Sequence, residues 1–235
     1  MAKGLKTIVL FSGGKDSCFA LWYALHQGWD VVALLSFHPE TSESWMFHYP
    51  AVKWGRLQAE AIKLPMIIVE TSGEKERELE DLKACLAELK QAFGIDAVVS
   101  GAVASEYQKT KIDRVSEETG IRSFAPLWHK NPAELVKEQI ELGFDAIITS
   151  CTALGFSRNW LGRKLDLESL MELQKLHGKY GIHISGEGGE YETLVLDAPL
   201  FKSKIVILEA HGQWSEEHHS GVFEITAAKL ASKNR

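Results

Sequence analysis

The segment from Ser12 to Ser17 contains residue types that can bind a phosphate. It follows an apolar, β-branched stretch at 6–11 and precedes a helical pattern. Gly13 and Gly14 let the backbone approach a ligand closely. The N–H groups at a helix start attract anions, with help from the helix dipole. Lys15 adds a mobile cation. The spacing is neither that of a Walker loop nor that of a dinucleotide fingerprint, so we predict an anion-binding turn of another kind.

A second segment with chemical potential runs from Gly186 to Thr193. It packs three carboxylates, three glycines and a tyrosine into eight positions. Carboxylates this close repel one another unless a cation or a positively charged ligand lies among them. The segment is therefore predicted to hold Mg²⁺, an ammonium ion or a substrate's quaternary ammonium group, and Tyr191 could add a cation–π face. An acidic hairpin loop in water is the alternative.

Composition narrows the classes of protein to consider. The 235 residues are 45% apolar, enough for one large or two small domains. No apolar run reaches the ~18 residues of a membrane span, and the first residues lack a signal-peptide layout, so we expect a cytoplasmic protein with no membrane partner. Cys18, Cys85 and Cys151 are far apart, which argues against structural zinc and disulfides. The net charge of −6, without a basic run, argues against nucleic acid as a partner.

The elements that must position the first segment alternate regularly. Strands are predicted at 6–11, 31–37, 66–70, 96–100 and 121–125, and helices at 16–27, 50–63, 74–93 and 105–119. This alternation predicts an α/β fold with a doubly wound, Rossmann-like parallel sheet. Ligands of such sheets bind beyond the carboxyl ends of the strands. Small residues there make Ser36 and Gly101 candidates for the adenine and ribose edge, with ordinary turn chemistry as the alternative for each.

The pattern changes after Trp128. Asn131 and Pro132 have the chemistry of a helix start, a strand is predicted at 144–150, and a helix at 167–180. Strands at 194–196, 204–208 and 222–226 follow without intervening helices, which predicts antiparallel or mixed pairing. We therefore predict a phosphate-binding domain over 1–128 and a smaller C-terminal α/β domain over 129–235 that carries the acidic segment and binds the substrate.

Several motifs together resemble a known family. Ser12–Ser17 has the pattern of the PP-loop ATP pyrophosphatases. With Glu43–His48, Gly101–Gln108 and Gly186–Phe201 in the same order, the chain resembles the diphthine–ammonia ligase (diphthamide synthase) family over nearly its whole length. The resemblance implies an adenine nucleotide alpha-hydrolase-like fold. It also implies a reaction in which ATP activates the carboxylate of diphthine on translation elongation factor 2. Pyrophosphate leaves in that step, and ammonia then displaces AMP to give diphthamide.

The resemblance implies ATP and Mg²⁺ as cofactors and assigns roles to both segments. The residues expected to bind the nucleotide are Ser12, Gly13, Gly14, Lys15, Asp16, Ser17, Ser36 and Gly101. Those expected to bind the acceptor or ammonium are Gly186, Glu187, Gly188, Gly189, Glu190, Tyr191, Glu192, Tyr107 and Gln108. The catalytic candidates are Lys15, Asp16, Glu187 and Glu190.

Several roles stay open at this point. Asp16 either ligates Mg²⁺, directly or through water, or caps the following helix. One acidic side chain could take a proton from ammonium. If the acidic segment serves only the acceptor, Glu190→Gln should leave ATP affinity nearly unchanged. Trp45, Phe47 and His48 belong either to a substrate-facing lid or to aromatic packing under a loop.

Two other functions fit the phosphate-binding motif. One is a PP-loop enzyme that adenylates another carboxylate or a tRNA base. The other is a non-catalytic module that binds an adenine nucleotide. Sulfur transfer would favour a reactive cysteine pair and a basic surface, and the sequence has neither. A homodimer is one assembly that the sequence leaves open.

Overall fold

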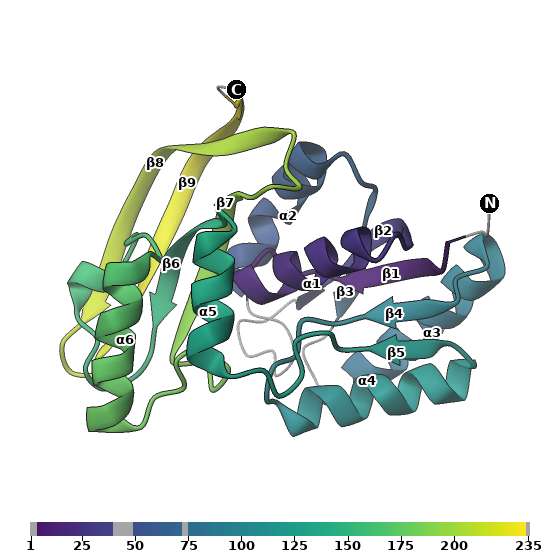
Figure 1. Ribbon diagram of the computed structural model, residues 1–235, viewed down its shortest axis with the longest axis horizontal. Helices are drawn as coiled ribbons and strands as arrows, with labels where there is room; N and C mark the ends of the chain where they lie inside the picture. Colours follow the sequence, from purple (N-terminus) through teal and green to yellow (C-terminus); the bar gives the residue numbers. More distant parts are fainter. Residues whose placement is uncertain (1–3, 40–48, 72–74, 234–235) are drawn as a thin grey trace. The chain divides into compact units, whose positions relative to one another are not determined.

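The computed structural model describes residues 4–39, 49–71 and 75–233 (Figure 1). The chain divides into two compact units. The first comprises Met1–Ser12, Asp16–Glu60 and Leu64–Trp128, and the second comprises Gly13–Lys15, Ala61–Lys63 and His129–Arg235. In the part of the chain that the structure describes, no helix is both long enough and apolar enough to cross a bilayer.

The first unit contains a five-stranded parallel sheet in the order β3-β2-β1-β4-β5 (Figure 1). Consecutive strands alternate with helices, and the direction of winding reverses between β1 and β4, so the predicted doubly wound sheet is confirmed. The strands are β1 (Lys6–Leu10), β2 (Asp30–Pro39), β3 (Met66–Thr71), β4 (Ala97–Val99) and β5 (Arg122–Phe124). The helices are α1 (Lys15–His26), α2 (Tyr49–Ile62), α3 (Lys75–Phe93) and α4 (Glu106–Thr119).

Helices α3 and α4 cover one face of this sheet. Leu82 and Leu86 of α3 and Ile112 of α4 are buried in one apolar cluster with Ile8 and Leu10 of β1. Each such side chain contributes about 1.5–3 kcal/mol when fully buried. Alternation along the strand sends the neighbouring β1 side chains to the opposite face. Because parallel strands are connected by right-handed crossovers, α1 and α2 lie on that opposite face.

The second unit contains a four-stranded sheet in the order β7-β6-β9-β8, and its pairs are antiparallel, as predicted for the C-terminal strands. The strands are β6 (Asp145–Cys151), β7 (Tyr191–Asp197), β8 (Ser203–Ser215) and β9 (Ser220–Ser232). The other elements are α5 (Pro132–Glu141), the short 3₁₀ helix η1 (Arg158–Trp160) and α6 (Leu167–Tyr180).

Two segments share one edge of β6. Strand β9 pairs with β6 at Ser150 and Cys151. Toward the start of β6, the segment Gly162–Leu165 pairs with the same edge instead. The Gly162 N–H donates to the Ile148 carbonyl and the Leu165 N–H to the Ala146 carbonyl, each at 2.8 Å. These bonds satisfy backbone groups that would otherwise be left at an open edge.

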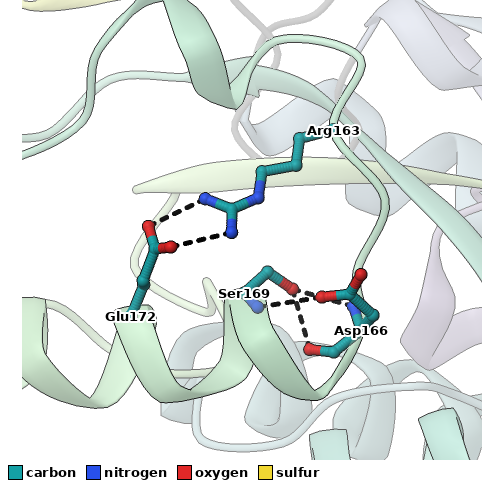
Figure 2. Close-up of polar contacts among 4 residues, drawn as sticks. All are labelled: Arg163, Asp166, Ser169 and Glu172. Carbon is teal, nitrogen blue, oxygen red and sulfur yellow. Dashed lines mark hydrogen bonds and ion pairs between the residues drawn. The ribbon is translucent and has the colours of Figure 1, made fainter.

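Helix α6 begins immediately after this edge segment and is fixed by two polar contacts (Figure 2). The Ser169 N–H donates to Asp166 Oδ1 at 2.9 Å and the Asp166 N–H donates to Ser169 Oγ at 2.8 Å, which forms a capping box. Arg163 donates two 2.8 Å hydrogen bonds to the Glu172 carboxylate. The guanidinium also lies 4.7 Å from the centroid of the Trp160 ring. The bounds of α6 are those that the sequence predicted.

Other boundaries differ from the prediction. Strand β2 extends to Pro39, two residues beyond the expected end, and β7 begins at Tyr191, inside the acidic segment. Strands β8 and β9 form a hairpin of 13 residues on each side instead of two five-residue strands. Much of this hairpin is half-buried or exposed, so its hydrophobic pattern is weak even though its backbone pairing is continuous.

Candidate functional site

The predicted phosphate-binding segment is a tight turn between β1 and α1. The Ser12 N–H donates to Ser17 Oγ at 3.3 Å, and the two serine hydroxyls are 3.1 Å apart. Gly13 has a φ of +83°, in the region that favours glycine. Helix α1 begins at Lys15. The segment therefore has the strand–turn–helix context expected of an anion-binding loop.

Gly101 lies against this turn within the first unit. A Cβ atom at Gly101 would be 2.8 Å from the Asp16 carbonyl carbon and 2.8 Å from the Ser17 backbone nitrogen. Both are backbone atoms, which cannot rotate away as a side chain could. The segment after β4 therefore packs directly on the first turn of α1, and only glycine allows this approach.

Ser36 is placed differently from the sequence interpretation. It pairs with Ile68 inside β2 and is almost completely buried, three residues before the strand ends. The sequence interpretation placed it at the carboxyl end of a shorter strand. Contact of Ser36 or Gly101 with a nucleotide stays a prediction.

Lys15 belongs with the second unit, and its side chain is only 3% exposed. The Lys15 Nζ donates to the Ser185 carbonyl at 2.5 Å and lies 5.5 Å from the centroid of the Tyr191 ring. The Lys15 backbone N–H donates to Thr193 Oγ1 at 3.1 Å. The second unit therefore brings the lysine of the phosphate-binding segment together with Tyr191 and Thr193 of the acidic segment.

The carboxylate of Glu190 is held by backbone amides. Its Oε1 accepts from the His183 N–H at 2.6 Å and its Oε2 from the Gly188 N–H at 2.9 Å. Amide donors stabilise a carboxylate charge without any cation. The charge of Glu190 therefore does not by itself require a bound cation, although the sequence predicted a positive partner for this segment.

Further bonds shape the same segment. The Tyr191 hydroxyl donates to the Ile184 carbonyl at 2.7 Å, and the Thr152 hydroxyl donates to the Gly189 carbonyl at 2.6 Å. Gly186 has a φ of +73°, and a Cβ there would lie 2.6 Å from the Tyr191 carbonyl oxygen. The segment is therefore a bonded turn rather than a solvated acidic loop.

Glu192 points away from its two neighbours in β7. Tyr191 and Thr193 point to one face of β7, and because side chains alternate along a strand, Glu192 points to the other. Over residues 4–39, 49–71 and 75–233, no group of three or more His, Cys, Asp and Glu side chains could hold a metal ion. Asp16 lies in the first turn of α1, where a carboxylate is favoured by the helix dipole. Its role as a Mg²⁺ ligand stays a prediction.

The remaining predicted residues lie at the start of α4 or outside the described chain. Ser105 is the N-cap of α4, and its hydroxyl accepts from the Gln108 N–H at 3.4 Å. The Tyr107 side chain is exposed, and Lys111 Nζ lies 5.6 Å from its ring centroid. Trp45, Phe47 and His48 lie outside the described residues.

The cysteines do not form a nucleophilic site. Burial, with a smaller contribution from the Asp16 charge, raises the pKa of the Cys18 thiol well above its usual value. Burial and the Glu88 charge raise the pKa of Cys85 to about 11, and burial raises that of Cys151 to about 12. All three are free thiols that stay protonated near neutral pH. Because the thiolate and not the thiol is the nucleophile, they are weak nucleophiles. Cys18 is fully buried among apolar neighbours, as expected of a packing residue.

Comparison with known proteins identifies a family that covers most of the chain. Family models match at residues 5–123, the diphthamide synthase N-terminal domain, and at residues 131–231, the diphthamide synthase C-terminal domain. Similar curated proteins are named diphthine–ammonia ligase. The protein of Schizosaccharomyces pombe is 36% identical over 98% of this chain, which spans 40% of that relative's length. The Danio rerio protein is 36% identical over 86% of each chain. The human protein is 33% identical over 86% of this chain and 83% of its own.

Proposed function

The chain belongs to the diphthamide synthase family, and on that basis we propose that it is an ATP-dependent ligase that forms an amide bond on diphthine. The acceptor would be the diphthine carboxylate on translation elongation factor 2 and the nitrogen donor would be ammonia. The products would be diphthamide, AMP and pyrophosphate. The observation in the structure that supports the proposal is the contact of Lys15, in the phosphate-binding turn, with Tyr191 of the acidic segment and with Ser185 immediately before it.

The turn from Ser12 to Ser17 would bind the phosphates of ATP. Backbone N–H groups at the start of α1, the two serine hydroxyls and the Lys15 ammonium are donors of the kind that stabilise the negative charge of a leaving pyrophosphate. ATP would supply the leaving group when its α-phosphorus is attacked by the substrate carboxylate. Holding acid and nucleotide together contributes roughly 7–11 kcal/mol at the upper limit for well-oriented reactants.

Asp16 fits a Mg²⁺ site of the usual kind. Mg²⁺ in nucleotide sites is commonly held by one or two carboxylates together with substrate phosphates and water. A single carboxylate in the first turn of α1, next to the phosphate-binding turn, would suffice for such a site. The ion would neutralise part of the phosphate charge.

The acceptor would be recognised by the remaining acidic and aromatic groups. Glu187 and Glu192 are candidates to bind the cationic diphthine side chain or to take a proton from ammonium. Tyr107 and Gln108 are candidates for contact with the protein substrate. A translation factor as substrate would place the reaction in the cytoplasm.

The test is incubation with ATP, ammonium and elongation factor 2 that carries diphthine. The proposal expects an amidated factor by peptide mass spectrometry, together with one AMP for each amide formed. ATP cleavage that depends on another carboxylate or on tRNA, with no amidated factor, would contradict the proposed acceptor. ATP binding without pyrophosphate release under all of these conditions would instead indicate a nucleotide-binding module.

A further inference from the structure

We infer that Glu190 is a positioning residue: its carboxylate shapes the turn from His183 to Glu190 so that the turn holds Lys15. The inference deepens the proposed function and rests on it only where ATP binding is concerned. The hydrogen bonds that support it lie within the second unit. Glu190 therefore acts on the reaction through Lys15, and not as a contact of the acceptor.

Each oxygen of the Glu190 carboxylate has its own amide partner. The partners, His183 and Gly188, are five residues apart, so the two bonds of 2.6 and 2.9 Å span the turn from one end to the other. Hydrogen bonds to an ionised acceptor are roughly twice as strong as neutral ones. A glutamine in this place would have one oxygen acceptor and an NH₂ group that cannot accept from the second amide.

The carbonyl groups of the same turn point to two side chains of the site. The Ile184 carbonyl accepts from the Tyr191 hydroxyl at 2.7 Å, and the next carbonyl, that of Ser185, accepts from Lys15 Nζ at 2.5 Å. Ser185 is itself buried, and its hydroxyl lies 2.9 Å from Nδ1 of His183. The two bonds to the Glu190 carboxylate hold the backbone of the turn, and the held backbone fixes where the Ser185 carbonyl lies.

The consequence falls on the lysine. An ammonium group has three donors and a flexible stem, and a carbonyl that takes one donor fixes where the group lies. Loss of the Glu190 bonds would free the turn and, with it, Lys15. This reverses the expectation from sequence that Glu190→Gln leaves ATP affinity nearly unchanged.

The first experiment measures the accessibility of Lys15 directly in the full-length protein. Wild type, Glu190→Gln and Glu187→Gln are treated with an amine-reactive reagent, and labelling of Lys15 is followed by peptide mass spectrometry with Lys233 as internal reference. Glu187→Gln is the matched control, because it removes the same charge from the same segment. Glu190→Gln should raise Lys15 labelling about tenfold, as expected for loss of a hydrogen bond to a charged group, and Glu187→Gln should not.

Equal labelling in wild type and Glu190→Gln would overturn the inference. So would an equal rise in both variants, because charge rather than geometry would then be responsible. A rise at Lys233 as well would indicate general loosening and would also count against it. If Glu190→Gln does not fold, Glu190→Asp replaces it in the same comparison, since its shorter side chain cannot span both amides.

The second experiment separates this inference from the proposed function. ATP binding to the same three proteins is measured by calorimetry. No binding by wild type would contradict the proposed function and leave the labelling result standing. Binding by wild type that weakens about tenfold in Glu190→Gln and not in Glu187→Gln supports the inference. Unchanged affinity in Glu190→Gln would overturn it while the proposed function stands.

Discussion

Two glycine-rich segments of this chain look alike in sequence and differ in how their polar groups are arranged. In Ser12–Ser17, a strand ends, a helix begins and serine hydroxyls lie beside the turn. In the turn from His183 to Glu190, the Glu190 carboxylate accepts from the amides of His183 and Gly188. The first arrangement gathers donors, whereas the second joins donors to an internal acceptor.

The difference shows why composition alone misleads at such segments. Clustered acidic residues predict a bound cation only if no other donor meets their charge, and backbone amides can do so. The two segments nevertheless meet at Lys15, which comes from the first and is held by the turn around the second.

The largest effect is expected from Lys15→Ala. Loss of one electrostatic contact to a developing charge typically lowers the rate about 10²–10³-fold. The buried Ser185 carbonyl also loses its donor, so the free energy of unfolding should fall by about 1–3 kcal/mol. Steady-state kinetics and denaturant unfolding measure the two effects, with the partly exposed Lys130→Ala as control. A folded Lys15→Ala protein with near-normal kcat would contradict the role of the phosphate-binding turn.

The next largest effect is expected from pH, because the proposed nitrogen donor is free ammonia. At fixed total ammonium, activity should rise with pH in step with the fraction of NH₃, until another group titrates. Replacing Cys18, Cys85 and Cys151 by Ser or Ala should lower activity only through stability, because the raised pKa values keep the thiols protonated. Initial rates from pH 6.5 to 9 test both. Efficient turnover on glutamine with ammonium removed would refute the expectation.

A smaller effect is expected at Gly101, which packs against the backbone of Asp16 and Ser17 in the first segment. Gly101→Ala would place a methyl group 2.8 Å from backbone atoms of α1 and should cost about 1–3 kcal/mol of stability, together with weaker ATP binding. Gly178→Ala is the matched control, since Gly178 is exposed in α6 with nothing near its Cβ direction, and it should stabilise by about 0.5–1 kcal/mol. Thermal unfolding of both variants gives the comparison. Equal melting temperatures would show that α1 shifts freely.

The smallest effect is expected at the Arg163–Glu172 pair, which joins the segment on the β6 edge to α6. The pair is partly exposed, so a double-mutant cycle with alanine should give about 0.2–1 kcal/mol of coupling. The hydrogen bond from Arg163, with a smaller effect of its charge, lowers the pKa of Glu172. The coupling should therefore be complete above the ordinary glutamate pKa and be lost as pH falls through the lowered value. Coupling that strengthens on acidification would contradict this sign.

The parallel sheet was predictable because its central strands β1 and β4 are almost entirely buried. Stretches such as Val31–Leu35 are continuously apolar, and the helices between the strands are followed by glycines such as Gly94 and Gly120. Helix α6 has the bounds that the sequence predicted, and the structure shows that Asp166 and Gly181 cap its two ends.

The acidic segment and the C-terminal hairpin were less predictable, for physical reasons. Tyr191–Thr193 belongs to β7, although acidic residues and glycines beside it favour a loop. The role of Glu190 depends on an amide seven residues away, at His183, which no local pattern reveals. The hairpin exposes much of both faces, so polar residues and glycines such as Glu209 and Gly212 interrupt the hydrophobic pattern that would predict a strand. Backbone pairing nevertheless continues through them.

The bond from the Lys15 amide to the Thr193 hydroxyl has a consequence for how the chain is made. It joins residues 178 positions apart, and the Gly13 carbonyl similarly accepts from the Val195 N–H. Contacts of such separation come at a high cost in chain entropy and form late. During synthesis from the N-terminus, the parallel sheet can assemble while its phosphate-binding turn still lacks these partners. The turn is therefore completed only when β7 has left the ribosome, so a truncated nascent chain would carry a folded sheet with an unfinished site.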